Sequence, residues 1–314
     1  MTKIKDYSAG LLLLIIIALP LFITNNYFIR LLSTMGIYLI IVMGLNILIG
    51  YTGLISIGQA GTFAVGAYSA ALLMTKTPLP FGIVFVIAIL EGILVGAFIG
   101  IVCLKLKNAY LAIVTLAFSL IIQTIVVNWR DVTGGMEGFL RIPKPSLFGF
   151  TIDTPIRGYY MVFVMNIIVF FIIRNILKSN WGRNLRAVRD DEIAAKMMGI
   201  NIVRSKVFSF IVASTAAAIS GCLYATLYGA IFPDYFNMDL STLFLSMIVI
   251  GGVGTIAGPI IGTMLITLIL EVFNMFGQVQ MLFYGITLII VCVVEPAGII
   301  ELFNRLRRRL VSKH

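Results

Sequence analysis

The sequence predicts an all-α protein, a polytopic bundle of transmembrane helices. Three observations support this fold class: 60% of the 314 residues are hydrophobic, only 11% are charged, and the mean hydropathy is +1.07. A helix needs about 20 apolar residues to cross a bilayer, and runs of this length recur along the chain. A soluble core of this size would need far more charged surface, and the strands of a membrane barrel would show alternation. We therefore expect a single membrane domain over residues 1–314.

The apolar runs predict about ten spans. They lie near residues 10–24, 29–49, 54–74, 81–104, 109–127, 159–177, 207–231, 240–257, 259–276 and 279–298. Glycines interrupt the third, eighth and ninth runs, so we expect some spans to be broken or re-entrant. The first run follows two lysines, as in a signal peptide, but no small-residue cleavage site comes after it. We expect it to stay as a first helix.

Positive residues predict the orientation, because cytoplasmic loops are enriched in lysine and arginine. With ten spans, both termini share one side with the following basic residues: Lys3, Lys5, Lys105, Lys107, the loop 178–206 and the tail residues Arg305, Arg307, Arg308, Arg309 and Lys313. This side is predicted to be cytoplasmic, and the loop 128–158 to be external. The net charge of +10 is then mainly a topology signal. Binding of nucleic acid would need a basic folded soluble face, which the sequence does not predict.

The residues required by common catalytic chemistries are missing from the sequence. The single histidine is His314, no Gly-x-x-x-x-Gly-Lys phosphate loop occurs, and Cys103, Cys222 and Cys292 lie far apart in apolar runs. We expect inert thiols, no catalytic residue, no metal site and no cofactor in this chain. Any energy source would come from another chain or from an ion gradient.

Three acidic residues lie within or at the ends of the predicted spans: Glu91, Glu271 and Glu295. An ionisable group at bilayer depth is a candidate for proton or ion coupling. The alternative is structural. Glu91 and Glu271 would then hydrogen-bond between helices, and Glu295 would reach the headgroups.

Two glycine clusters, over residues 50–66 and 251–262, predict broken helices or close helix packing. Glycine costs about 1 kcal/mol relative to alanine inside a helix, so this density needs a reason. Non-helical backbone at membrane depth is tolerated where it is buried in protein or lines a cavity, and broken helices in both halves mark transport pathways. The candidate pathway residues are Gly53, Ser56, Gly58, Gln59, Gly251, Gly252, Gly254, Gly258 and Pro259. Packing of small residues is the alternative, and the two explanations are compatible.

The loop 178–206 is a charged island with seven positive and three negative residues. Within it the sequence predicts a short amphipathic helix from Asp190 to Gly199. Acidic residues at the start suit the helix dipole, an Asp can cap it, and Gly199 can end it. Glu192 and Lys196 are expected to pair, and Ile193, Met197 and Ile200 to share one face. So short a helix needs a partner to be stable. That partner is another protein or the lipid headgroups.

Several segments of the chain carry short sequence blocks that are shared with one known family of proteins. The island contains WGRNLRAVRDDEIAA, including the Glu-x-Ala-Ala element. The matching blocks elsewhere are GLISIGQA (53–60), GAY (66–68), YLAIVTLAF (110–118), TGGMEG (133–138) and GGVGTIAGP (251–259). With these blocks in this order, the chain resembles the LivM-like branched-chain amino acid permeases of bacterial ABC importers. One departure is Gln59, where many members have His.

The resemblance implies a permease subunit in a bacterial inner membrane, with no enzymatic activity of its own. It implies a second, homologous permease, two ATPase subunits that bind ATP and magnesium, and an extracytoplasmic protein that delivers a branched-chain amino acid. The 184–204 segment would couple to an ATPase subunit through Asp190, Asp191, Glu192, Ile193, Ala194, Ala195, Met197 and Gly199. The competing hypothesis is a gradient-driven transporter or channel for a small polar solute that uses Glu91 or Glu271.

Overall fold

The computed structural model describes residues 25–77, 79–106, 108–147, 149–274, 277, 280–294 and 298–300. The predicted first span, Glu295 and the basic tail lie outside these residues, as does the side chain of Cys292. The helices are α2 (Asn26–Asn46), the π-helix η1 (Ile47–Tyr51), α3 (Gln59–Lys76), α4 (Phe81–Val102), η2 (Cys103–Lys105), α5 (Asn108–Asn128), α6 (Arg130–Thr133), η3 (Gly135–Glu137), α7 (Pro155–Lys178), α8 (Asn180–Asp190), α9 (Glu192–Met197), α10 (Ile202–Tyr228), η4 (Pro233–Phe236), α11 (Met238–Gly251), α12 (Gly258–Phe273) and α13 (Gln280–Val294).

Five helices in the described ranges are long and apolar enough to cross a membrane. They are Asn26–Tyr51, Phe81–Val102, Ala109–Asn128, Pro155–Lys178 and Ile202–Tyr228, and the shorter Met238–Gly251 and Gly258–Phe273 are apolar too. An all-α, multi-pass architecture is thus confirmed. The count of ten spans and the side of the termini stay predictions.

Helix caps explain why two spans begin earlier than their apolar runs. The run near 159–177 is part of α7, which starts at Pro155 after Thr154 accepts a hydrogen bond from the backbone of Arg157. The run near 207–231 is part of α10, which starts at Ile202 with Asn201 as its cap. Capping residues and a proline in the first turn start helices in polar sequence, where hydropathy gives no signal.

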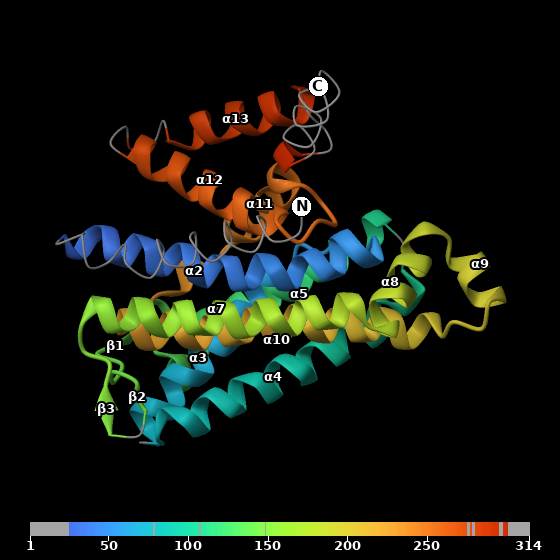
Figure 1. Ribbon diagram of the computed structural model, residues 1–314. Helices are drawn as coiled ribbons and strands as arrows, with labels where there is room; N and C mark the ends of the chain where they lie inside the picture. Colours follow the sequence, from blue (N-terminus) through green and yellow to red (C-terminus); the bar gives the residue numbers. More distant parts are fainter. Residues whose placement is uncertain are drawn as a thin grey trace.

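The core forms where α10 packs against α2, α3 and α4 (Figure 1). Its face is rich in small residues, with Ala213, Ala217 and Ala218 fully buried. Small side chains let helix backbones approach closely in a membrane bundle. Phe63 of α3 and Phe244 of α11 fill the space beside them.

The two long loops lie at opposite ends of the bundle (Figure 1). Helices α8 and α9 extend from one end. The strands β1 (Phe139–Leu140), β2 (Ser146–Leu147) and β3 (Phe150–Thr151) lie at the other. β1 pairs antiparallel with β4 (Ala230–Ile231), and β2 pairs with β3. The loop 128–158 is thereby fastened to the end of α10.

Candidate functional site

Helix α9 is a separate helix that Asp191 starts. Asp191 has extended backbone (φ −159°, ψ 114°), and its Oδ1 accepts hydrogen bonds from the backbone N–H groups of Ile193 at 2.7 Å and Ala194 at 3.1 Å. Such a cap is typically worth about 1 kcal/mol. The predicted helix start at Asp190 is wrong, because Asp190 ends α8 and the extended residue after it separates the two helices.

The predicted glycine cap at the other end of α9 is confirmed. Gly199 is left-handed at φ +80°, and its N–H donates to the carbonyl of Lys196 at 3.0 Å. The N–H of Ile200 donates to the carbonyl of Ala195 at 3.0 Å. These two bonds form the Schellman motif that closes many helices. Ile200 lies beyond the helix end, so it does not continue the apolar face predicted for it.

The outer face of α9 is apolar and uncovered. Ile193 is 74% exposed and Met197 is 83% exposed, and residues four apart lie on the same helix face. Ala195 is only 3% exposed and forms the inner face. Figure 1 shows α9 projecting from the end of the bundle. Two large apolar side chains presented together on a projecting helix are typical of a contact surface, and this role of α9 stays a prediction.

An ion pair fastens α9 to the first turns of α10. The Oε1 atom of Glu192 lies 2.6 Å from the Nζ atom of Lys206, whose side chain is only 5% exposed. The predicted pair with Lys196 is therefore wrong. A buried ammonium group without a counter-charge is strongly unfavourable. The carboxylate of Glu192 therefore pairs with the buried Lys206 and not with Lys196 in the next turn of α9.

Helix α8 is held against the bundle by aromatic and arginine contacts. The ring of Trp181 stacks on Phe208 of α10 at 4.4 Å between centroids. Arg186 donates from NH2 to the carbonyl of Leu177 at 3.2 Å, and its guanidinium lies 5.4 Å from the ring centre of Tyr51 in η1. Cation–π contacts of this kind are worth about 0.5–1 kcal/mol at exposed sites. These contacts hold α8, which leads directly into α9, against the membrane bundle.

The first glycine cluster does contain a helix break, between η1 and α3. Residues 53–58 are not helical. Their backbone is held by side chains from other helices: the N–H of Ile57 donates to Oγ1 of Thr115 at 3.0 Å, and that of Ala60 donates to Oγ of Ser241 at 3.0 Å. The bond from Ala60 satisfies a donor that the start of α3 leaves free, and the bond from Ile57 holds the non-helical segment before it.

The polar pathway candidates beside this break are buried. Ser56 and Gln59 are each 2% exposed. The Oε1 atom of Gln59 has no hydrogen-bond partner among the described residues, which is rare for a buried acceptor. Gly58 also packs tightly, since a Cβ there would lie 3.1 Å from the carbonyl carbon of Thr115. The pathway role of these residues stays a prediction.

The second glycine cluster breaks the chain between α11 and α12. Thr255 organises this break, because its Oγ1 donates to the carbonyl of Gly252 at 2.9 Å and accepts from the N–H of Gly258 at 3.0 Å. Pro259 follows in the first turn of α12. Gly251 packs directly against Gly258, where a Cβ would lie 2.7 Å from the carbonyl carbon. The second cluster therefore both interrupts the helix and packs closely, which are the two compatible explanations that the sequence left open.

The two glycine clusters meet at Asn46, near the end of α2. Its Nδ2 donates to the carbonyl of Thr255 at 2.8 Å, and its Oδ1 accepts from the N–H of Gly254 at 3.0 Å. Gly254 also lies against Gly50, so that a Cβ on Gly254 would be 2.9 Å from the Gly50 carbonyl oxygen. Segments about 200 residues apart therefore share one junction. Sequence reasoning missed Asn46, although an amide inside an apolar run was a usable signal.

The acidic side chains within the bundle make interhelical hydrogen bonds. Glu91 of α4 accepts from Ser69 of α3, and Glu271 of α12 accepts from Tyr27 of α2. Both contacts match the structural alternative, while ion coupling is untested. Cys103 and Cys222 are buried free thiols. In the described ranges, no group of three His, Cys, Asp or Glu side chains could hold a metal ion.

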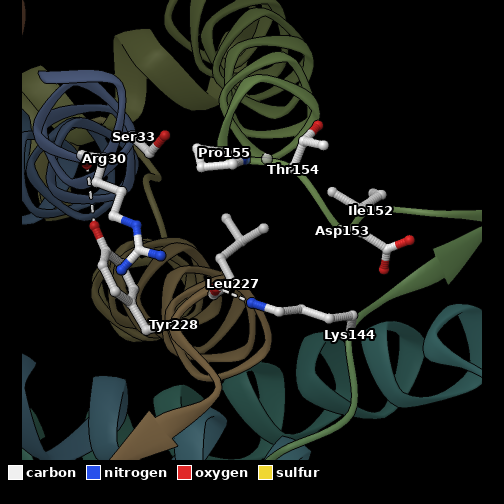
Figure 2. Close-up of a pocket in the computed structure, with 10 residues that line it drawn as sticks. Arg30, Ser33, Lys144, Ile152, Asp153, Thr154, Pro155, Leu227 and Tyr228 are labelled. Atoms are coloured by element: carbon white, nitrogen blue, oxygen red, sulfur yellow. Dashed lines mark hydrogen bonds between the residues drawn. The ribbon is translucent and has the colours of Figure 1, made fainter. Parts of the chain in front are cut away.

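Figure 2 shows a small cavity between the first turns of α2 and α7 and the last turn of α10. It has a volume of about 50 Å³. Lys144 donates to the carbonyl of Leu227 at 3.0 Å, and Tyr228 donates to the carbonyl of Arg30 at 3.0 Å. The first bond satisfies a carbonyl in the last turn of α10, and the second joins the end of α10 to α2. Along α2, Arg30 and Asn46 are separated by roughly 24 Å of helix rise. The cavity is therefore distinct from the glycine junction.

Replacing Gly254 with alanine is expected to destabilise the junction. The residue has φ +74°, and the new Cβ would lie 2.9 Å from the carbonyl oxygen of Gly50. We expect the free energy of unfolding to fall by about 1–3 kcal/mol, measured by thermal unfolding in detergent. Gly82→Ala is the matched control, because no described atom lies within 4 Å of its Cβ position. Equal stability of the two variants would contradict the proposed packing.

Comparisons with known proteins give consistent matches over most of the chain. The family model described as "Branched-chain amino acid transport system / permease component" matches residues 27–292. The permease protein LivM of Salmonella typhimurium is 30% identical over 93% of this chain and 74% of its own, and that of Escherichia coli K12 is 30% identical over 85% and 68%. The permease protein LivH of Salmonella typhimurium is 25% identical over 73% and 79%. No solved structure matches significantly.

Proposed function

Since the chain belongs to the family of branched-chain amino acid transport system permease components, we propose that it is a permease subunit of an ATP-driven ABC importer. The observation that carries this proposal is the uncovered apolar face of α9. Ile193 and Met197 project from a helix that is capped at both ends and fixed to α10 by an ion pair. A surface of this kind suits insertion into a groove of an ATPase subunit.

The proposed partners follow from the relatives. Both LivM and LivH are named as permease proteins of high-affinity branched-chain amino acid transport systems, and this chain resembles both. We propose that a second, homologous permease completes the translocation path. Two ATPase subunits would hold ATP and magnesium, and an extracytoplasmic binding protein would deliver the substrate. The assembly would lie in a bacterial inner membrane.

The proposed mechanism is mechanical. ATP-driven movement of the ATPase subunits would push α9, and with it α8 and the end of α10 to which Lys206 belongs. The two glycine breaks give the bundle places where the chain can bend at membrane depth. Rigid segments moving about such points would alternate the access of a central path between the two sides. The substrate class proposed is a branched-chain amino acid.

Reconstitution tests this function directly. The permease is placed in proteoliposomes with its partner permease, ATPase subunits and binding protein, and uptake of labelled leucine is measured with and without ATP. We expect uptake only with ATP and the complete set of subunits. If the isolated chain takes up leucine on an imposed ion gradient, the ABC proposal is wrong and the gradient-driven hypothesis gains support. Replacing Glu91 and Glu271 with glutamine would then identify the ion site.

A further inference from the structure

We propose that Arg189 is the positioning residue that joins the docking helix α9 to both glycine breaks. This inference rests on the proposed function and adds the route by which movement of α9 reaches the membrane bundle. Arg189 lies in the last turn of α8, two residues before the Asp191 cap of α9. From the sequence alone, the charge of Arg189 indicates only which side of the membrane its loop occupies. Its contacts point to a further role.

The guanidinium group of Arg189 reaches across to the end of the π-helix η1. Its NH1 donates to the carbonyl oxygen of Gly50 at 2.8 Å. Its Nε and NH2 lie 3.1 Å and 3.0 Å from Oδ1 of Asp190. The adjacent carboxylate therefore holds one edge of the planar group, so that the remaining nitrogen faces the carbonyl. Lysine could not make this arrangement, because its ammonium is a single point charge without a fork.

Both glycine breaks contact this one side chain. A Cβ on Gly53 would lie 3.1 Å from Cγ of Arg189, and a Cβ on Gly254 would lie 3.2 Å from its NH1. Both glycines have φ +74°, so each is the residue where its segment turns. Gly50, which receives the hydrogen bond, also touches Gly254. Arg189 thus lies between two turning points that come from different halves of the chain.

The contact is placed to transmit movement. Only Asp191 separates α8 from α9. In this proposal a displacement of α9 is passed through Asp191 to the last turn of α8, and it shifts Arg189 relative to Gly50 and Gly254 while the start of α8 stays against the bundle. The side chain of Arg189 is 41% exposed, and exposed ion pairs add little to stability. Loss of folding stability would therefore be small when Arg189 is removed. Loss of coupling is the effect that its position predicts.

The ratio of leucine uptake to ATP hydrolysis distinguishes a role of Arg189 in coupling from a role in assembly. Arg189→Ala is introduced into the complete complex, and three quantities are measured: co-purification of the ATPase subunits, ATP hydrolysis, and leucine uptake per ATP. We expect assembly and basal hydrolysis to stay within about twofold of wild type, and uptake per ATP to fall about tenfold or more. Arg189→Lys should recover only part of the uptake, since it restores the charge without the fork.

A labelling experiment measures whether the junction between the two glycine breaks changes during the transport cycle. In a chain whose three cysteines are replaced by serine, Val253→Cys provides a thiol at an exposed position of the second break. We expect its labelling rate to change when ATP and vanadate are added to the wild-type complex, and to stay constant in Arg189→Ala. Arg183→Ala is the matched control, because it removes the same charge from the same helix, where the side chain bonds only to Asn180 in the described structure.

The outcomes distinguish this inference from the proposed function. Arg189→Ala with wild-type uptake per ATP, or with the same labelling response as wild type, would overturn the coupling role. Loss of the ATPase subunits together with uptake would also overturn it, because the residue would then act in assembly. If the wild-type chain assembles with no ATPase, the proposed function itself fails and the coupling role fails with it.

Discussion

Replacing Ile193 and Met197 together with aspartate is expected to abolish co-purification of the permease with its ATPase subunits, while the membrane bundle stays folded. Both side chains are largely exposed, at 74% and 83%, so polar replacements do not disturb the isolated chain. In a complex, each carboxylate would have to leave water, at a cost of several kcal/mol. The loss of apolar burial in the complex would weaken binding further, by about 1.5–3 kcal/mol per side chain. Affinity should therefore fall more than about a hundredfold.

The measurement is pull-down of the ATPase subunits by a tagged permease, with thermal unfolding of the permease as the control for folding. The double leucine variant, Ile193→Leu with Met197→Leu, is the matched control, because it keeps the face apolar and of similar volume. We expect it to assemble as wild type does. Undiminished assembly of the double aspartate variant would show that this face does not enter an ATPase groove. The lipid headgroups would then be its partner.

Sequence reasoning predicts the local chemistry of α9 because that chemistry lies within a few residues. Asp191 caps its own following turn, and Gly199 ends the helix through bonds to residues just before it. The exposed pair Ile193 and Met197 follows from helical spacing alone. The glycine breaks are predicted for a similar reason, since backbone that costs helix stability can be read position by position.

Contacts between distant segments could not be predicted in this way. Glu192 takes Lys206 in place of Lys196 because burial of the lysine, set by the packing of α10, decides which pair forms. Arg189 contacts Gly50 across 139 residues, and Asn46 contacts Thr255 across 209. The amide of Asn46 in an apolar run is a signal, but no local pattern identifies the distant partner of Asn46 or of Arg189. Helix α8 was not predicted either, because its many polar residues remove the hydropathy signal; the signal that remains is the helical spacing of its buried residues Gly182, Leu185 and Val188.

The interface between α3 and α10 is a place where a single added methyl group should have a large effect on folding. A Cβ on Gly66 would lie 2.6 Å from the Cα of Ala218, and a Cβ on Gly221 would lie 2.7 Å from the backbone nitrogen of Ala67. The obstacles are backbone atoms, which cannot rotate away as side chains do. We expect Gly66→Ala and Gly221→Ala each to lower the free energy of unfolding by about 1–3 kcal/mol. Gly66→Val should prevent recovery of folded protein.

Thermal unfolding in detergent and the yield of monodisperse protein measure these effects. Gly285→Ala is the control, because it lies inside α13 with no described atom within 4 Å of its Cβ position. Alanine there should leave stability unchanged or raise it by up to about 1 kcal/mol. Gly221 and Gly66 belong to the same contact, since a Cβ on Gly221 would lie 3.1 Å from the carbonyl carbon of Gly66. One separation of the helices would relieve both overlaps, so the double alanine variant should lose less stability than the two single losses combined. Additive losses would mean that the two glycines are not at one shared contact.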